Sequence, residues 1–125
     1  MQPEAPQHIV LALAQINCTV GDLAGNAGRI LDQAERARRA GADLLLTPEL
    51  SLAGYPPEDL LLRESFYTDC RRELDRLAQR IQGISAVVGF PELAGDGRRY
   101  NAAALIRDGR IVAVRSEEHT SELQS

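Results

Sequence analysis

The sequence contains no lysine and no tryptophan, and it has only two cysteines, two histidines and one methionine. Each of its 14 basic residues is therefore an arginine, which cannot share a proton as a lysine ammonium can. Cys18 and Cys70 are too few for a disulfide framework and form no CxxC motif. His8 and His119 stand apart without HxH or HExxH spacing, so the sequence predicts no metal site.

Long apolar runs are absent as well. The run at residues 9–16 is far too short to span a membrane, and the first residues lack the basic and apolar regions of a signal peptide. We therefore expect a cytoplasmic protein with no membrane partner. A formal net charge of -4 offers no basic excess for nucleic acid, and a hydrophobic content of 44% is typical of a soluble domain.

Two apolar runs with a helical pattern between them predict a strand-helix-strand unit. Residues 9–16 are almost uninterrupted in apolar character, which is typical of a central strand covered on both faces, and residues 44–47 form a second such run. Between them, Asn26 can cap a helix that Gly41 ends. The apolar positions of this helix are Ile30, Ala34 and Ala37. We expect the two strands to pair in parallel.

The second half of the chain predicts a helix followed by antiparallel strands. A short helix is expected to begin near residue 57, and a longer one has the apolar stripe Phe66, Cys70, Leu74, Leu77 and Ile81. Residues 85–90 form a third predicted strand. Asp108-Gly109, flanked by apolar segments at 100–106 and 110–114, predicts a hairpin with a type I′ turn. The fold class is therefore α/β with a mixed sheet, parallel first and antiparallel at one side.

Glu49 is the first candidate catalytic residue. It follows the apolar run Leu44–Leu46 and enters a segment rich in glycine and proline, TPELSLAGYPP. Placing a carboxylate at the end of a buried strand is unfavourable unless something pairs with it, so chemistry explains this glutamate better than packing does. We expect Glu49 to be mostly shielded from water, with the turn at residues 54–57 beside it.

Four blocks in order carry a resemblance to a known family. They are IVLALAQINCTVGDLAGN (9–26), GADLLLTPELSLAGYPPEDLLLR (41–63), VVGFPE (87–92) and YNAAALIRDGRIVAV (100–114). Together they resemble the nitrilase, or carbon-nitrogen hydrolase, superfamily. The stretch GYPPEDLLLR is similar in particular to the glutaminase domain of glutamine-dependent NAD synthetases.

The resemblance implies a fold, a mechanism and a set of partners. The fold would be an incomplete α-β-β-α sandwich, of which this chain holds roughly the first half. Glu49 would be the general base of a Glu-Lys-Cys triad whose lysine and cysteine lie further along the chain, so the segment alone is predicted to be inactive. The parent would hydrolyse glutamine, or another small amide, through a cysteine thioester. It would pass ammonia to a second domain that uses ATP and magnesium to amidate deamido-NAD, and it would be a homo-oligomer. No cofactor is expected in this segment.

Four other residues near these motifs have competing interpretations. Tyr55 could line the amide pocket with its ring and hydroxyl, or it could simply pack the loop down, and the sequence leaves both open. Glu92 follows a strand but opens a polar loop, so we expect it at the surface or the rim of a pocket. Cys18 lacks an adjacent acid or histidine and is expected to be a loop or core-edge residue. Cys70 falls on an apolar stripe and is expected in the core.

The last eleven residues, RSEEHTSELQS, fit neither the preceding strand nor the family's continuation. They resemble the translation of a sequencing-adapter read-through. We therefore divide the chain into a partial carbon-nitrogen hydrolase (glutaminase) domain at residues 1–114 and a non-native tail at 115–125, which is expected to make few tertiary contacts.

Two alternatives remain open from the sequence. One is a stand-alone amidase or nitrilase acting on another amide, and the other is a non-catalytic α/β module that binds a ligand at the same strand ends. A later lysine and cysteine would favour an enzyme, and a later ATP site would favour an NAD synthetase.

Overall fold

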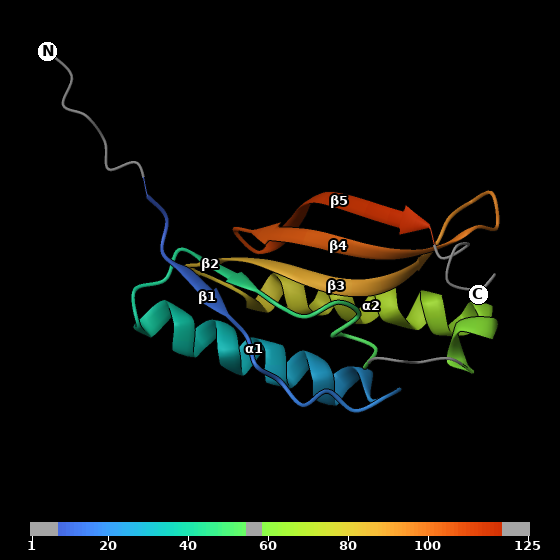
Figure 1. Ribbon diagram of the computed structural model, residues 1–125, viewed down its shortest axis with the longest axis horizontal. Coiled ribbons are helices and arrows are strands. Elements are labelled where there is room, and N and C mark those ends of the chain that lie inside the picture. Colours follow the sequence, from blue (N-terminus) through green and yellow to red (C-terminus); the bar gives the residue numbers. More distant parts are fainter. Residues whose placement is uncertain (1–7, 55–58, 119–125) are drawn as a thin grey trace, which may run out of the picture.

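The computed structural model describes residues 8–54 and 59–118, which form a five-stranded sheet with helices on one face (Figure 1). The elements in chain order are β1 (Leu11–Leu13), α1 (Leu23–Arg39), β2 (Leu44–Leu46), the 3₁₀ helix η1 (Leu60–Leu62), α2 (Glu64–Arg80), β3 (Ser85–Leu93), β4 (Arg99–Arg107) and β5 (Arg110–Glu118). The strands lie in sequence order across the sheet. The first two pairings are parallel and the last two antiparallel, which confirms the predicted mixed α/β sheet.

Helix α1 begins one turn earlier than the sequence predicted. Its N-cap is Asp22, whose Oδ1 accepts a hydrogen bond from the backbone N–H of Gly25 at 3.1 Å. Asn26, the predicted cap, lies inside the helix and is fully buried. The predicted end is confirmed, because Gly41 has φ +88° and the N–H of Ala42 donates back to the carbonyl of Ala37 at 3.0 Å.

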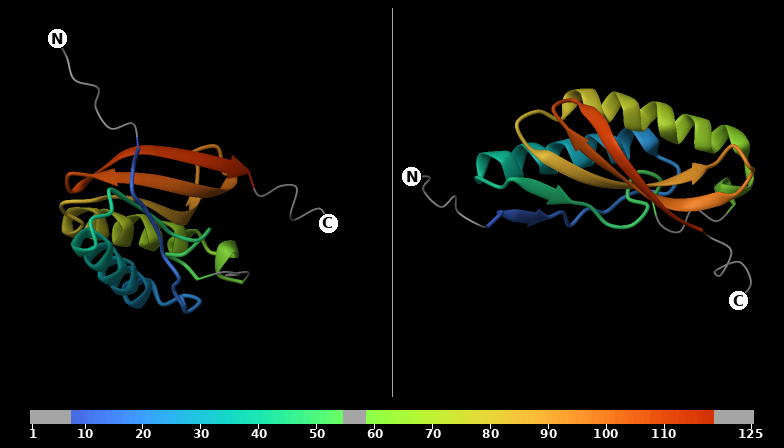
Figure 2. Two further views of the ribbon diagram at one scale, coloured as in Figure 1. Left: turned by 60° about the vertical axis from the view of Figure 1, so that its left-hand side comes forward. Right: turned by 90° about the horizontal axis from the view of Figure 1, so that it is seen from above.

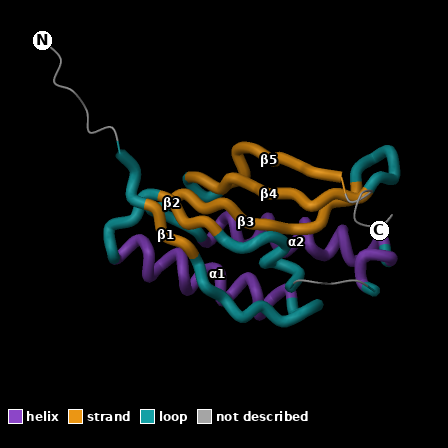
Figure 3. Tube along the Cα trace, in the orientation of Figure 1, coloured by secondary structure: helices purple, strands orange, loops and turns teal. Residues whose placement is uncertain are grey.

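The two long helices pack side by side beneath the strands, as the tube in Figure 3 shows. The predicted stripe on α2 is confirmed, because each of its members is buried in the structure: Phe66, Cys70, Leu74, Leu77 and Ile81. Ile30, Ala34 and Ala37 of α1 are buried as well. Neither long helix within the described residues is apolar enough over sufficient length to cross a membrane.

Strand β1 corrects an expectation. Among the described residues it spans three positions, pairs only with β2 and forms one edge of the sheet rather than a central strand. Leu11 and Leu13 are 53% and 71% exposed. The apolar run was typical of a strand covered on both faces, but in the described part of the chain α1 and α2 cover only one face of the sheet (Figure 2).

Alternation along the strands shows which side chains occupy the uncovered face. Val88 of β3 and Ala104 of β4 are fully buried in the core between the sheet and the helices. Because successive side chains of a strand point to opposite faces, Val87, Gly89 and Asn101 belong to the other side. We call this side of the sheet, opposite α1 and α2, the open face.

The hairpin of β4 and β5 confirms one prediction and corrects another. Asp108 and Gly109 have φ +55° and +77°, as a type I′ turn requires. However, β5 does not stop at Val114: residues 115–118 continue it, with Arg115 opposite Ala103. The expectation of few tertiary contacts is therefore wrong for residues 115–118, since backbone pairing extends a strand whatever its side chains are. Residues 119–125 lie outside the described part.

Candidate functional site

The residues after β2 fold back onto β3 and carry Glu49. Beyond Leu46, the backbone N–H of Thr47 donates to the carbonyl of Val87 at 3.1 Å, and that of Leu52 donates to the carbonyl of Gly89 at 3.1 Å. This turn therefore takes over from β2 as the neighbour of β3. It places Glu49 at the carboxyl end of the parallel pair, as the sequence predicted.

A hydroxyl network fixes the base of the turn. The Oγ1 of Thr47 donates to the carbonyl of Val87 at 2.9 Å. The same oxygen accepts from the hydroxyl of Ser51 at 2.8 Å and from the N–H of Gly89 at 3.3 Å. Ser51 is only 2% exposed. These bonds tie both ends of the segment that carries Glu49 to β3.

The backbone beside Glu49 is strained and closely packed. Leu50 has φ +55°, a conformation that a bulky residue rarely adopts and that is characteristic of functional sites. A Cβ atom on Gly89 would lie 2.6 Å from the backbone nitrogen of Leu50 and 2.8 Å from the carbonyl oxygen of Pro48. Only a glycine at position 89 therefore allows the Glu49 turn to lie this close to β3.

The Glu49 side chain reaches the open face and is exposed, which contradicts the expectation that it is mostly shielded. Its Oε2 accepts a hydrogen bond from the Nδ2 of Asn101 on β4 at 3.3 Å. The reason for the exposure is architectural, because both helices cover the opposite face of the sheet and no described layer lies over this one.

An open pocket of about 400 Å³ surrounds this carboxylate. It is lined by Thr47, Pro48, Glu49, Val87, Gly89, Asn101, Ala102, Ala103, Arg115, Ser116 and Glu117. The pocket thus joins the Glu49 turn, two central strands and the end of β5. A carboxylate fixed by its backbone and open to a pocket can accept a proton from a group placed there.

Asn26, which the sequence predicted as a helix cap, instead has a structural role between two loops. Its Nδ2 donates to the carbonyls of Thr19 at 2.8 Å and Leu52 at 2.9 Å, and its Oδ1 accepts from the N–H of Thr19 at 2.8 Å. It joins the loop after β1 to the Glu49 turn. The available signal was its spacing, since Asn26 precedes Ile30 by four residues and thus falls on the buried stripe of α1.

Of the other candidate residues, those that the structure describes do not line the pocket around Glu49. Cys70 is fully buried, which confirms its core position, and burial raises the pKa of its thiol to about 12. Burial also raises the pKa of the Cys18 thiol, partly opposed by Arg29, and this direction is the reverse of what a nucleophile needs. Glu92 accepts a hydrogen bond from the Ser116 hydroxyl at 2.7 Å. Tyr55 lies outside the described residues.

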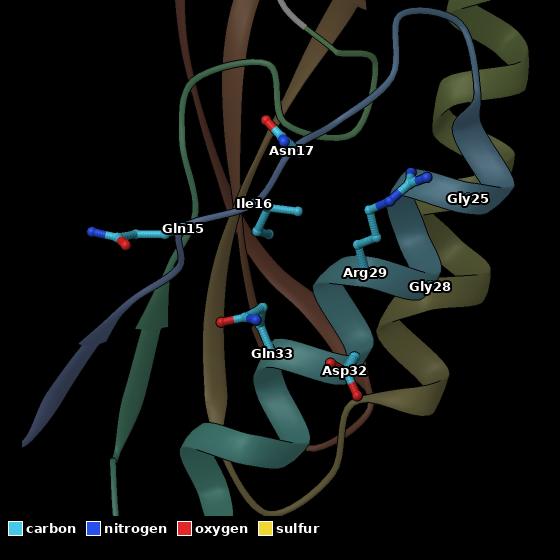
Figure 4. Close-up of a pocket in the computed structure, with 8 residues that line it drawn as sticks. All are labelled: Gln15, Ile16, Asn17, Gly25, Gly28, Arg29, Asp32 and Gln33. Carbon is cyan, nitrogen blue, oxygen red and sulfur yellow. The ribbon is translucent and has the colours of Figure 1, made fainter.

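A second pocket, of about 510 Å³, lies between the loop after β1 and the first turns of α1 (Figure 4). It is lined by Gln15, Ile16, Asn17, Gly25, Gly28, Arg29, Asp32 and Gln33, and it shares no residue with the pocket around Glu49. Arg29 forms an ion pair with Asp22, with 3.7 Å between a guanidinium nitrogen and the carboxylate Oδ2. Within residues 8–54 and 59–118, no three His, Cys, Asp or Glu side chains cluster as a metal site requires.

Comparison with known proteins agrees with this architecture. A family model described as carbon-nitrogen hydrolase matches residues 10–123. The glutamine-dependent NAD(+) synthetase of Xylella fastidiosa (strain Temecula1 / ATCC 700964) is 47% identical over 102 residues, which are 81% of this chain and 18% of the relative. The chain therefore spans less than a fifth of the length of that protein.

Solved structures give the same two groups of relatives. The glutamine-dependent NAD+ synthetase from Acinetobacter baumannii, in complex with ADP, superposes with a TM-score of 0.80 at 36% identity over 87% of this chain and 20% of its own. An amidase from Nesterenkonia sp. superposes with a TM-score of 0.72 at 33% identity over 88% of this chain and 43% of its own. In another structure of that amidase, acrylamide is added at the active site cysteine. The mixed α/β sheet is thus of the nitrilase type, as expected.

Proposed function

The chain belongs to the carbon-nitrogen hydrolase family, and we propose that it forms the amino-terminal part of the glutamine-hydrolysing domain of a glutamine-dependent NAD synthetase. The observation that carries this proposal is the Glu49 carboxylate, held at the end of β2 within a segment similar to those synthetases and facing an open pocket.

In this proposal Glu49 is the general base. Amide hydrolysis by this route needs a thiolate to attack the carbonyl carbon, a base to take the thiol proton and pass it to the leaving ammonia, and a cation near the developing oxyanion. The fixed turn and the exposed side chain of Glu49 suit the second role. The cysteine and the lysine would come from residues that follow this segment in the parent, and they would approach from the open face.

The ammonia released would serve a second reaction in the parent. We propose that a separate domain amidates deamido-NAD to NAD with ATP and magnesium, and that the parent is a homo-oligomer. Support for the synthetase assignment is the 47% identity to the Xylella fastidiosa synthetase, against 33% to the amidase from Nesterenkonia sp.. The chain covers 43% of the amidase but only 18% of the Xylella fastidiosa synthetase. A stand-alone amidase acting on another small amide is therefore the second candidate.

A chimera tests the assignment of Glu49. Residues 10–114 replace the matching segment of the Xylella fastidiosa synthetase, and NAD formation is measured with glutamine and, separately, with free ammonia. We expect Glu49→Gln to reduce glutamine-dependent synthesis by about 100-fold or more, as loss of a general base does, while ammonia-dependent synthesis is retained. Glu92→Gln, a carboxylate outside the pocket, is the matched control and should change neither activity.

Each other outcome contradicts part of the proposal. Equal loss of both activities in Glu49→Gln would mean that Glu49 is structural, and no loss would mean that it is not the base. A chimera that uses ammonia but never glutamine would contradict the assignment to a glutaminase domain.

We also propose that the 125-residue chain alone is inactive and that residues 115–125 are foreign to the parent. A base without its nucleophile cannot carry out acyl transfer, so the purified chain should release no ammonia from glutamine. Turnover abolished by Glu49→Gln would show that the chain contains a nucleophile, such as Cys18. The origin of the tail is tested by sequencing the parent gene past Val114, where a different continuation is expected.

A further inference from the structure

Asn101 is a buried polar residue on the open face, and its side chain contacts Glu49. It lies on β4, is only 7% exposed and is followed by three alanines. Its Nδ2 donates to the Oε2 of Glu49 at 3.3 Å, across 52 positions of sequence. A buried amide is unfavourable unless it is hydrogen-bonded, so this contact gives an asparagine here a physical reason.

The strand that carries Asn101 is well placed to hold another side chain still. Strand β4 pairs with β3 along almost its whole length, with Asn101 opposite Pro91. The amide donor therefore projects from the first half of a hydrogen-bonded strand rather than from a loop. Glu49, by contrast, is an exposed glutamate in a turn, and its terminal torsion has no sharp preference of its own.

A general base needs that torsion to be fixed. A carboxylate has two oxygens, and a donor bonded to one of them restricts the torsion and with it the position of the other. With Oε2 held by Asn101, Oε1 remains for the proton of a nucleophile in the pocket. Displacement of a catalytic group by about 1 Å can lower the rate about 100-fold, so the tether matters for the chemical step rather than for binding.

We propose that Asn101 is a positioning residue, which orients the Glu49 carboxylate through its Nδ2–Oε2 hydrogen bond so that the free oxygen faces the reacting thiol. This inference rests on the proposed glutaminase function. The two side chains most similar to asparagine would not serve this role at position 101. An aspartate would place a second carboxylate against the first, and a glutamine would displace the amide by one methylene.

The test uses the chimera and separates kcat from KM for glutamine. We expect Asn101→Ala to lower kcat by about 10- to 100-fold, because the base loses its orientation, with KM changed by less than about 3-fold. Ammonia-dependent synthesis should be unchanged. Asn17→Ala removes an exposed asparagine of the second pocket and should leave all three quantities unchanged.

Two further variants distinguish positioning from a merely structural role. Asn101→Asp should move the acidic limb of the pH–rate profile to higher pH, because two adjacent carboxylates resist ionising together. In the Glu49→Gln background, Asn101→Ala should cause no further loss, since residues acting through one group are not additive.

The outcomes are separable from those of the proposed function. A raised KM with unchanged kcat would make Asn101 a binding residue, and equal loss with glutamine and with ammonia would make it structural. Full activity of Asn101→Ala, while Glu49→Gln is inactive, would overturn this inference and leave the proposed function intact. Activity in both variants would overturn both.

Discussion

At the scale of single residues, Gly89 is the position where one added methyl group would collide with the backbone of the Glu49 turn. Its absent Cβ leaves room for backbone atoms of Leu50 and Pro48, which cannot move as a flexible side chain can. We expect Gly89→Ala to lower the free energy of unfolding by about 1–3 kcal/mol through overpacking, measured by urea denaturation of the 125-residue chain.

Gly95→Ala is the matched control, because a Cβ there meets no atom within 4 Å. It should change the free energy of unfolding by no more than about 0.5 kcal/mol. Equal effects of the two substitutions would show that the close approach of the Glu49 turn to β3 is not rigid.

Cys70 gives a second residue-scale prediction, on pH. Burial raises the pKa of its thiol to about 12 from the ordinary value of 9.0. In the unfolded chain the thiol ionises near its ordinary pKa. Above that pH, the folded chain still holds the proton while the unfolded chain releases it. Stability from this group is complete below about pH 9 and is lost as the pH rises towards 12.

The measurement is the free energy of unfolding between pH 8 and pH 11, in the chain and in Cys70→Ala. We expect a shallower decline in the variant, although its absolute stability is lower because a buried sulfur is removed. Identical slopes would mean that Cys70 does not hold its proton.

In the folded chain, iodoacetamide should label Cys18, which is partly exposed, before the buried Cys70.

Local chemistry alone predicted part of the site. The sequence placed Glu49 at the exit of β2 because an apolar run followed by a glycine- and proline-rich turn is a local signal. It did not predict Asn101 as its partner, because their contact depends on the order of β2, β3 and β4 in the sheet. Nor did it predict the exposure of Glu49, which depends on which face the helices cover.

At the scale of elements, Asn26 connects a helix to two loops. Its side chain amide bonds the carbonyl of Thr19 in one loop and that of Leu52 in the other, while it is fully buried in α1. Asn26→Asp keeps the size but removes both donors and buries a charge. We expect a loss of about 3 kcal/mol in the free energy of unfolding, since buried carbonyls left unpaired are costly.

Asn17→Asp makes the same chemical change at an exposed position and should alter stability by no more than about 0.5 kcal/mol. Thermal unfolding of the two variants beside the parent chain checks this. If Asn26→Asp unfolds at the temperature of the parent chain, the two loops are held together by other contacts.

Elements with a strong local period were predicted well, and those defined by their neighbours were not. The stripe on α2, the glycine end of α1 and the Asp108-Gly109 hairpin all follow from local spacing or turn chemistry. The extent of β1 and β5 does not, because a strand lasts only as long as its partner does. Strand β1 is therefore shorter than its apolar run, and β5 is longer than its apolar segment.

At the scale of the whole molecule, the described chain has an apolar sheet face with no layer over it. Leu11 and Leu13 of β1, with Ile9 before them, are each more than half exposed on or beside the outer strand. Exposed apolar area of this kind, next to an unpaired strand edge, promotes association. The mixed sheet was predictable from its turns, whereas the layers on either side depend on the complete chain.

We therefore expect the isolated 125-residue chain to self-associate as its concentration rises, and Leu13→Lys to weaken that association. Leu13 is 71% exposed, so the substitution removes little buried area and should not unfold the chain, while a lysine on an outer strand opposes stacking and edge pairing. Leu62→Lys is the matched control, because Leu62 is also 71% exposed but lies in η1 rather than on the sheet. Sedimentation velocity over a range of concentrations measures both variants. Equal weakening by the two would attribute the association to net charge, and no weakening by Leu13→Lys would mean that the chain does not associate through the end of the sheet at β1.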